Sequence, residues 1–102
     1  MPRRRPTVAR IMHGRLKKPT LKKAIREWRA YGPAYKASKG FRGAYLLVDP
    51  KTGDLQSITL WTDKASMRAN ARTVLTATLA DFGRYFSKKP TPTYHRVNAT
   101  IE

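Results

Sequence analysis

The sequence predicts an α+β fold, a ferredoxin-like β-α-β-β-α-β protomer with an antiparallel sheet. Two observations support this prediction. Segments rich in aromatic and β-branched residues, which favour strands, alternate with segments whose apolar residues recur every three or four positions, which favours helices. Near the middle of the chain, two strand-like segments flank a run of turn-forming residues and lead at once into a helix. We expect residues 7–102 to form one domain.

The central hairpin is the clearest element. Residues 41–48 and 55–61 are the predicted strands, and the segment between them contains Pro50, which presets φ, and Gly53, which accepts a positive φ. Both faces of the second strand are partly apolar. We therefore expect one face of the sheet to pack on helices and the other to meet a second sheet across a dimer interface.

The flanking elements follow from periodicity. Residues 7–16 have the pattern of a strand, and the helix after it should break at Gly32-Pro33, with a short turn beyond. Residues 63–87 are expected to form the main helix, because an apolar stripe runs along them at spacings of three and four. Lys88-Lys89-Pro90 should end this helix, and residues 91–101 should form the last strand.

The charge is strongly basic and unevenly distributed. The chain has 22 Lys and Arg against 6 Asp and Glu, a net charge of +16, and residues 1–42 contain a single acid, Glu27. Residues 1–6, with three arginines and two prolines, are expected to be a disordered basic arm. Such a balance implies an anionic partner or a need for solubility.

Several classes of function are excluded or disfavoured. The chain has no cysteine, which excludes disulfides and cysteine-based sites and fits a reducing, cytoplasmic location. No apolar run approaches the roughly 20 residues of a membrane span. Nucleotide-binding glycine loops, zinc-protease motifs and serine elbows are absent. His13 and His95 lie on different predicted strands without nearby carboxylates, so we expect neither a metal nor a cofactor.

One stretch resembles a known family. Gly40-Phe41, a strand, Asp49-Pro50-x-Thr52-Gly53, a strand that ends in Trp61, and then a helix are similar to the antibiotic-biosynthesis-monooxygenase (ABM) family. The resemblance implies a ferredoxin-like protomer that pairs into a homodimeric α+β barrel. It also implies a small-molecule ligand. The family includes cofactor-free monooxygenases, haem-degrading enzymes and members without assigned chemistry.

The haem-degrading branch fits poorly at its functional positions. Those relatives use an Asn on the first strand and a Trp and a His on the helix after the hairpin. Here Met12 or His13 stands near the Asn position, Asn70 near the Trp position and Ala80 near the His position. None of these residue types matches, so haem degradation is disfavoured.

The cofactor-free monooxygenases resemble the chain better. They carry a strand Trp with an Asn four residues before it, and a Tyr on the following helix. Trp61 matches the Trp, Ser57 replaces the Asn, and Met67 stands near the Tyr. Ser57 would donate a hydrogen bond to a bound oxyanion, more weakly than an amide. His13 is a further candidate as an acid or base, because histidine titrates near neutral pH.

These considerations lead to a predicted function: binding of a small anionic aromatic molecule, with cofactor-independent monooxygenation as the reaction. The basic charge would attract such a substrate and favour its deprotonated form. The catalytic candidates are Trp61, Ser57 and His13. The candidate wall residues of a pocket between sheet and helices are Trp28, Tyr45, Met67, Asn70 and Phe82.

Two alternatives remain open. One is a nucleic-acid or polyanion-binding module, in which aromatic residues interleaved with cations stack on the bases of a single strand. The other is a non-enzymatic dimeric scaffold, in which Trp61 would be fully packed and no cavity would exist. The residues expected to contact a polyanion are Arg3, Arg4, Arg5, Lys22, Lys23 and Arg26.

Overall fold

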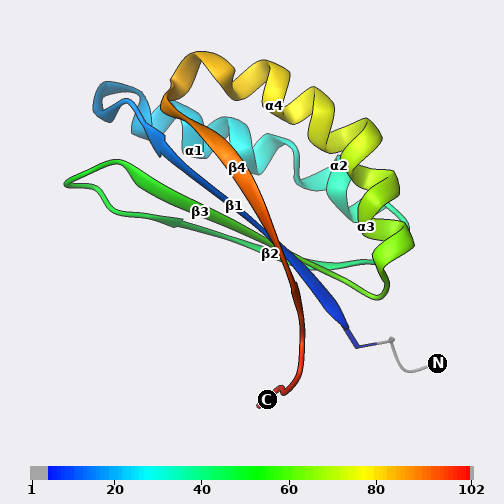
Figure 1. Cartoon of the computed structure of the whole chain (residues 1–102). Coiled ribbons are helices and arrows are strands. Elements are labelled where there is room, and N and C mark those ends of the chain that lie inside the picture. Colours follow the sequence, from blue (N-terminus) through cyan, green and yellow to red (C-terminus); the bar gives the residue numbers. More distant parts are fainter. Residues whose placement is uncertain (1–4, 102) are drawn as a thin grey trace.

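The computed structural model describes residues 5–101 and shows a four-stranded sheet with helices on one face (Figure 1). The strand order is β2-β3-β1-β4, and all neighbouring strands are antiparallel. This arrangement confirms the predicted ferredoxin-like α+β fold. The strands are β1 (Val8–Leu16), β2 (Phe41–Val48), β3 (Asp54–Trp61) and β4 (Phe86–Arg96).

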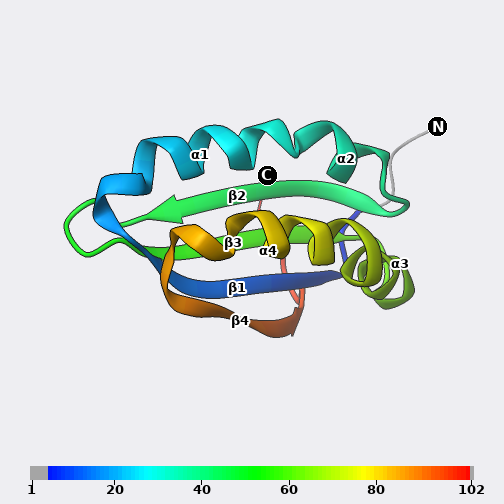
Figure 2. The same ribbon diagram turned by 90° about the horizontal axis from the view of Figure 1, so that it is seen from above.

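The helices form two runs above the sheet. The first run is α1 (Leu21–Ala30) and α2 (Gly32–Ala37), which meet at the predicted break and lie along the β2 edge (Figure 2). The second run lies over the middle of the sheet and consists of α3 (Lys64–Asn70), a π-helical turn (Ala71–Leu75) and α4 (Thr76–Phe82). Asp63 begins this run as an N-cap, since its carboxylate accepts a hydrogen bond from the backbone N–H of Ser66 at 2.7 Å.

The prediction of one helix over residues 63–87 is wrong at its end. The helix stops at Phe82, a 3₁₀ turn follows over Gly83–Tyr85, and β4 begins at Phe86. Two contacts fix this boundary: the backbone carbonyl of Tyr85 accepts a hydrogen bond from Lys17, and Phe86 pairs with Leu16 of β1. Tyr85 is also buried in the core. The prediction of the last strand over residues 91–101 is wrong at both ends, because β4 spans Phe86–Arg96 and residues 97–101 have no regular secondary structure.

The core lies between the helices and the upper face of the sheet. Its buried centre consists of Leu16, Ala24, Leu55, Phe82 and Tyr85. The hairpin that closes one end needs Gly53, because its φ is +83° and a Cβ there would collide with the carbonyl oxygen of Leu16.

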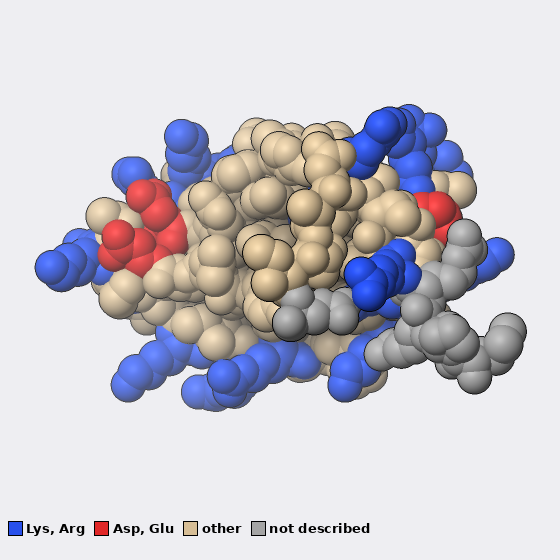
Figure 3. All heavy atoms as spheres, turned by 90° about the horizontal axis from the view of Figure 1, so that it is seen from below, with Lys and Arg blue, Asp and Glu red and all other residues tan. Residues whose placement is uncertain are grey.

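The lower face of the sheet is not covered by any described element. Tyr45 and Leu47 are 61% and 50% exposed there. Figure 3 shows that Lys and Arg side chains gather around the margin of this face and leave its centre largely uncharged. We call this surface the open sheet face.

The two sheet edges differ. Strand β4 carries Pro90 and Pro92, which have no N–H to donate, and Lys88 and Lys89 precede them. Along the other edge, β2, lie α1 and α2 (Figure 2). Within residues 5–101, no helix has both the length and the apolar character needed to cross a bilayer.

Candidate functional site

A cavity opens between the first helical run and β2. It has a volume of about 300 Å³, and we call it the side cavity. Trp28 and Tyr35 from the helices and Phe41 from β2 form its aromatic walls, and Ser57 and Thr59 of β3 also line it. The side cavity thus combines flat apolar surfaces with a small polar patch, as ligand sites commonly do.

A second, inner cavity lies deeper, between the sheet and α4. Its volume is only about 50 Å³, room for little more than one water molecule. Met12, Thr78 and Phe82 are among its walls. Trp28, Tyr35 and Ser57 line both cavities. Of these two cavities, only the side cavity has room for a ligand larger than water. The three shared side chains would lie between such a ligand and the core.

Ser57 is the polar group best placed to contact a ligand. Its hydroxyl forms no hydrogen bond with any residue between 5 and 101, so its proton is available. Tyr35 is already engaged: its hydroxyl lies 3.1 Å from Thr78 Oγ1. Thr78 donates its own proton to the carbonyl of Val74 at 2.7 Å, so Tyr35 is the donor in the first bond. Burial raises the pKa of the Tyr35 hydroxyl above its ordinary value.

Cations surround the side cavity. Arg29 and Lys36 stand at its rim and are exposed, and no Asp or Glu lines it. Farther inside, the positive charge of Arg10 acts on Tyr35 through the protein interior. The electrostatic field at the cavity therefore favours an anion.

Arg10 itself is a buried cation on the central strand, only 1% exposed. Its guanidinium donates to Asn70 Oδ1 at 2.8 Å and to the carbonyl of Met67 at 3.3 Å, and it lies over the ring of Trp61. Burial lowers its pKa, and its Nε has no hydrogen-bond partner. Among the described residues, no carboxylate forms an ion pair with Arg10. The sequence marks this residue only as an interruption of the apolar strand.

No protein-family model and no curated protein sequence matches the chain. Solved structures do match it. A protein of unknown function from Nitrosomonas europaea has a TM-score of 0.81 at 15% identity, with 98% of this chain and 97% of that chain covered. A monooxygenase from the gene ActVA-Orf6 of Streptomyces coelicolor, solved with nanaomycin D, has a TM-score of 0.80 at 11% identity, with 95% and 92% covered. A haem-degrader from Mycobacterium tuberculosis, solved with two haems, has a TM-score of 0.71 at 18% identity, with 93% and 99% covered.

The chain has an ABM-like fold. A protein described as an antibiotic biosynthesis monooxygenase from Nitrosomonas europaea matches with a TM-score of 0.80 at 7% identity, with 100% of both chains covered. At such identities the similarity concerns the fold, and the resemblance seen in the hairpin is confirmed at that level.

Within the ABM-like fold, the predicted site residues fall into three groups. Ser57 and Trp28 line both cavities, and Phe82 lines the inner one. Met67 and Asn70 are buried around Arg10 instead, and Met67 also forms the floor of a separate groove between α3 and β4.

Trp61 belongs to the buried group. It is 0% exposed and lines neither cavity, and its indole Nε1 donates to Thr59 Oγ1 at 2.9 Å. Its ring packs against Phe41, with the ring centroids 5.4 Å apart. Trp61 therefore supports the walls of the side cavity from behind, through Thr59 and Phe41.

The third group, His13 and Tyr45, lies on the open sheet face, away from both cavities. Strand alternation from Phe41 would place Tyr45 on the helix side, but a bulge at Arg42 shifts the register between Phe41 and Gly43 and reverses the parity. Tyr45 consequently pairs with Ile58 and is exposed.

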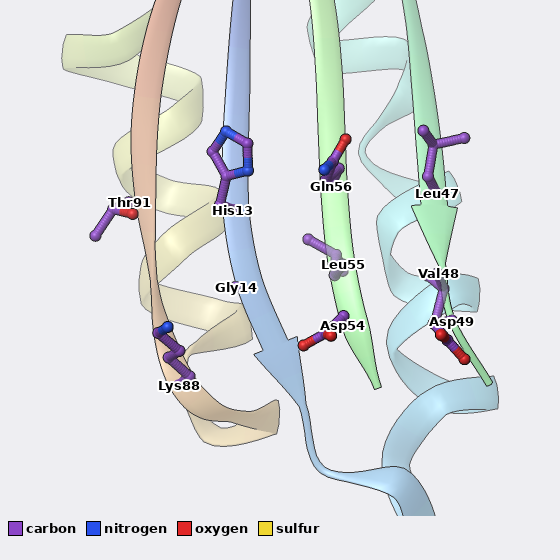
Figure 4. Close-up of a pocket in the computed structure, with 10 residues that line it drawn as sticks. All are labelled: His13, Gly14, Leu47, Val48, Asp49, Asp54, Leu55, Gln56, Lys88 and Thr91. Carbon is purple, nitrogen blue, oxygen red and sulfur yellow. The ribbon is translucent and has the colours of Figure 1, made fainter. Parts of the chain in front are cut away.

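His13 lines a shallow hollow of about 690 Å³ at one end of the open sheet face (Figure 4). Its Nε2 lies 3.0 Å from Thr93 Oγ1, and His95 Nε2 lies at the same distance from that oxygen. At the far side of the hollow, Arg15 donates to Asp54 and holds the pKa of that carboxyl below its usual range. The described residues contain no group of three or more potential metal ligands among His, Asp and Glu.

The candidate polyanion contacts are also partly placed. Arg3 and Arg4 lie outside the described residues, and Arg5 is exposed in a segment without regular structure. Lys22, Lys23 and Arg26 are exposed on α1. Tyr35 was not predicted as a site residue, because it lies in α2, beyond the break at Gly32-Pro33, and the helical spacing of α1 does not extend to it.

Proposed function

We propose that the protein binds a small anionic aromatic molecule in the side cavity and oxidises it with dioxygen. The observation that carries this proposal is the composition of the cavity: aromatic walls, the unengaged hydroxyl of Ser57 and a cationic rim without any acid. Its volume of about 300 Å³ is at the lower end of the usual range for ligand pockets.

The cavity offers a specific role to each group. An aromatic ligand would stack between Trp28 and Phe41, and the positive charges of Arg29 and Lys36 would lower the pKa of its phenol. Ser57 would donate its proton to the phenolate oxygen. The hydrogen bond from Tyr35 to Thr78 keeps the Tyr35 ring fixed as a wall.

The proposed reaction needs only the deprotonated ring and dioxygen. The electron-rich ring carbon opposite the phenolate oxygen reduces dioxygen and forms a bond to one of its oxygen atoms. That carbon loses its hydrogen as a proton, and the other oxygen atom leaves as water. A phenol and O₂ thus give a quinone and H₂O, with dioxygen reduced and the ring oxidised. The contribution of the chain is to bind the anionic form and exclude bulk water.

Ligand binding is tested with a matched pair of probes, 1-hydroxy-2-naphthoate and its neutral methyl ester, by quenching of tryptophan fluorescence. We expect the anion to bind at least tenfold more tightly, which corresponds to about 1.4 kcal/mol. Ser57→Val should weaken binding, and Thr93→Val, on the open sheet face, is the matched control. Equal affinity for both probes, or equal effects of the two variants, would contradict the proposed site.

Oxidation is tested separately with an oxygen electrode and electron-rich dihydroxynaphthalenes. If the rate of oxygen uptake rises in proportion to the occupancy of the side cavity, the result supports the monooxygenase activity. Binding without uptake would leave the ligand site in place and refute the oxidation step. A purely scaffolding role predicts that Trp61 is packed and that there is no cavity. Trp61 is packed, but the side cavity is present, so the second expectation does not agree with the geometry.

We further propose that two copies pair through the open sheet face, where Tyr45, Leu47, Ile58 and Leu60 present apolar side chains. Pairing would bury these side chains and complete an α+β barrel. A cytoplasmic location is part of the proposal, because a chain without cysteine has no need of an oxidising compartment.

A further inference from the structure

The outer side of α1 carries a row of cations that the proposed ligand site does not use. We call this row, with the turn before it, the α1 surface; it consists of Lys17, Lys18, Lys22, Lys23 and Arg26. All five are exposed, and none forms a salt bridge or a side-chain hydrogen bond with any residue between 5 and 101. The charges are therefore available to a partner.

Among residues 5–101, no carboxylate forms an ion pair with the α1 surface. The one acid on α1, Glu27, is already engaged by Arg84 at 3.3 Å and by the hydroxyl of Tyr85 at 2.8 Å. The opposite side of α1 is anchored, because Ala24 is buried in the core and Leu21 packs against it. The cations thus stand on a helix whose position is fixed by packing.

The spacing of these residues suits a phosphate backbone. Lys22 and Arg26 are four positions apart on α1, which places them along one line of the helix, and Lys18 precedes them in the 3₁₀ turn before α1. From Lys22 to Arg26 this line extends about 6 Å at 1.5 Å per residue. One strand of a B-form duplex carries a phosphate about every 3.4 Å along its axis, so about two phosphates fall within that length, and the lysines of the preceding turn extend the contact.

No aromatic side chain belongs to the α1 surface, so bases could not stack on rings beside these cations. Trp28 lines the cavities, the Tyr31 hydroxyl donates to Asp81, and Tyr35 bonds Thr78. Phe41 packs against Trp61. Recognition of a single strand depends on such stacking, so the geometry does not favour it. What remains is contact with phosphates, which carries no sequence information.

We propose that the α1 surface binds the phosphate backbone of a nucleic-acid double helix without reading its sequence. Since the helices lie on the side of the sheet away from the open sheet face, this contact is compatible with pairing of two copies (Figure 1). It is also independent of the ligand cavity, because none of the five cations lines it.

The salt dependence gives a quantitative expectation. Each neutralised phosphate contributes about −0.9 to the slope of log K against log salt concentration. Five contacts predict a slope of about −4.5, so raising the salt from about 50 to about 200 mM should weaken binding roughly 500-fold. The measurement is fluorescence anisotropy of a labelled 20-base-pair DNA duplex, repeated with a second duplex of unrelated sequence and with the single strand.

Two triple variants separate this surface from the general charge of the protein. Lys22→Gln/Lys23→Gln/Arg26→Gln removes cations from the α1 surface, and Lys64→Gln/Arg68→Gln/Arg72→Gln removes the same number from the other helical run. All six residues are exposed, and circular dichroism checks that both variants fold. We expect the α1 variant to lose about 2.7 units of slope and at least a hundredfold in affinity near 50 mM salt, and the control to change by less than threefold.

Other results would overturn the proposal. Equal losses in the two variants would mean that overall charge, not the α1 surface, attracts the duplex. Tighter binding of the single strand, with quenching of tryptophan fluorescence, would show that bases stack. Equal affinity for phosphatidylserine vesicles, with the same dependence on the α1 variant, would identify a membrane surface as the partner.

Discussion

The guanidinium carbon of Arg10 lies 5.4 Å from the ring centroid of Trp61, and both side chains are almost completely buried. An aromatic face attracts a cation, most strongly where water is absent. Asn70 accepts a hydrogen bond from the other side of the guanidinium, at 2.8 Å, and itself donates to Ser38 at 3.0 Å. A cation is thus held in the interior by neutral groups.

This cluster predicts non-additive stability changes. Arg10→Met leaves Asn70 Oδ1 buried without a partner, which should cost about 1–3 kcal/mol in urea unfolding. In Arg10→Met/Asn70→Leu the unpaired oxygen is gone, so the double variant should be more stable than the sum of the single variants predicts. Simple additivity would mean that the two side chains do not act as a unit.

Trp61 and Trp28 should differ in what their substitution affects. Trp61→Phe loses the contact with Arg10 and the bond to Thr59, so we expect it to lower the free energy of unfolding by about 1–3 kcal/mol. Its affinity for the naphthoate probe should remain within threefold of the wild type. Trp28→Leu removes a wall of the side cavity and should lower the affinity for the naphthoate probe at least tenfold. If Trp61→Phe lost affinity for the probe and Trp28→Leu kept it, Trp61 and not Trp28 would be the residue on which ligand binding depends.

Tyr31 should make stability depend on pH in alkaline solution. Its hydrogen bond to Asp81 raises the pKa of Tyr31 to about 12 from an ordinary value of 10.0. The unfolded chain therefore loses this proton first, and the stabilisation present below pH 10 disappears as the pH approaches 12. We expect the Tm difference between wild type and Tyr31→Phe to shrink over this interval. Tyr94→Phe, which removes an exposed tyrosine, serves as the control.

Two glycines should respond to alanine in opposite directions. Gly40 has a φ of +79°, and a Cβ there would lie 2.5 Å from the Cβ of Ser66. Gly40→Ala should therefore destabilise the protein by more than about 1 kcal/mol. Gly83 has a helical φ of −50° with open space around it, so Gly83→Ala should stabilise by about 0.4–1 kcal/mol. Thermal unfolding of both variants checks the signs.

Pairing through the open sheet face predicts that one charge placed there separates the copies. Leu47 is half exposed in the single chain, so Leu47→Glu should leave its folding intact but bury an unpaired carboxylate in the dimer. Light scattering after size exclusion should show the mass of one chain for this variant and twice that mass for the wild type. Arg72→Glu, on a helix, is the control, and a monomeric wild type would contradict the proposed pairing.

The fold was predictable because its decisive signals are local. Pro50 and Gly53 specify the hairpin turn within a few residues, and the helix break at Gly32-Pro33 is equally local. The end of the main helix was not predictable from local signals. Tyr85 and Phe86 continue an apolar helical stripe, and they become turn and strand only through contacts with β1.

The candidate site was predictable only in part, for a similar reason. Ser57 was a candidate because the family resemblance implied it, and Trp28 because helical periodicity was combined with that resemblance. The bulge at Arg42 has no such signal, and it decides on which face Tyr45 lies. Arg10 was not recognised because a cation in a strand is ordinarily exposed, and its neutral partners come from positions 51 to 60 residues away along the chain.

The prolines of β4 also have a consequence for concentrated solutions. A sheet can grow into fibrils when an edge strand offers an unbroken row of donors and acceptors to another molecule. At positions 90 and 92 that row lacks donors, and the neighbouring lysines of separate molecules repel one another. Since α1 and α2 lie beside the opposite edge, we expect both edges of the sheet to resist lateral polymerisation.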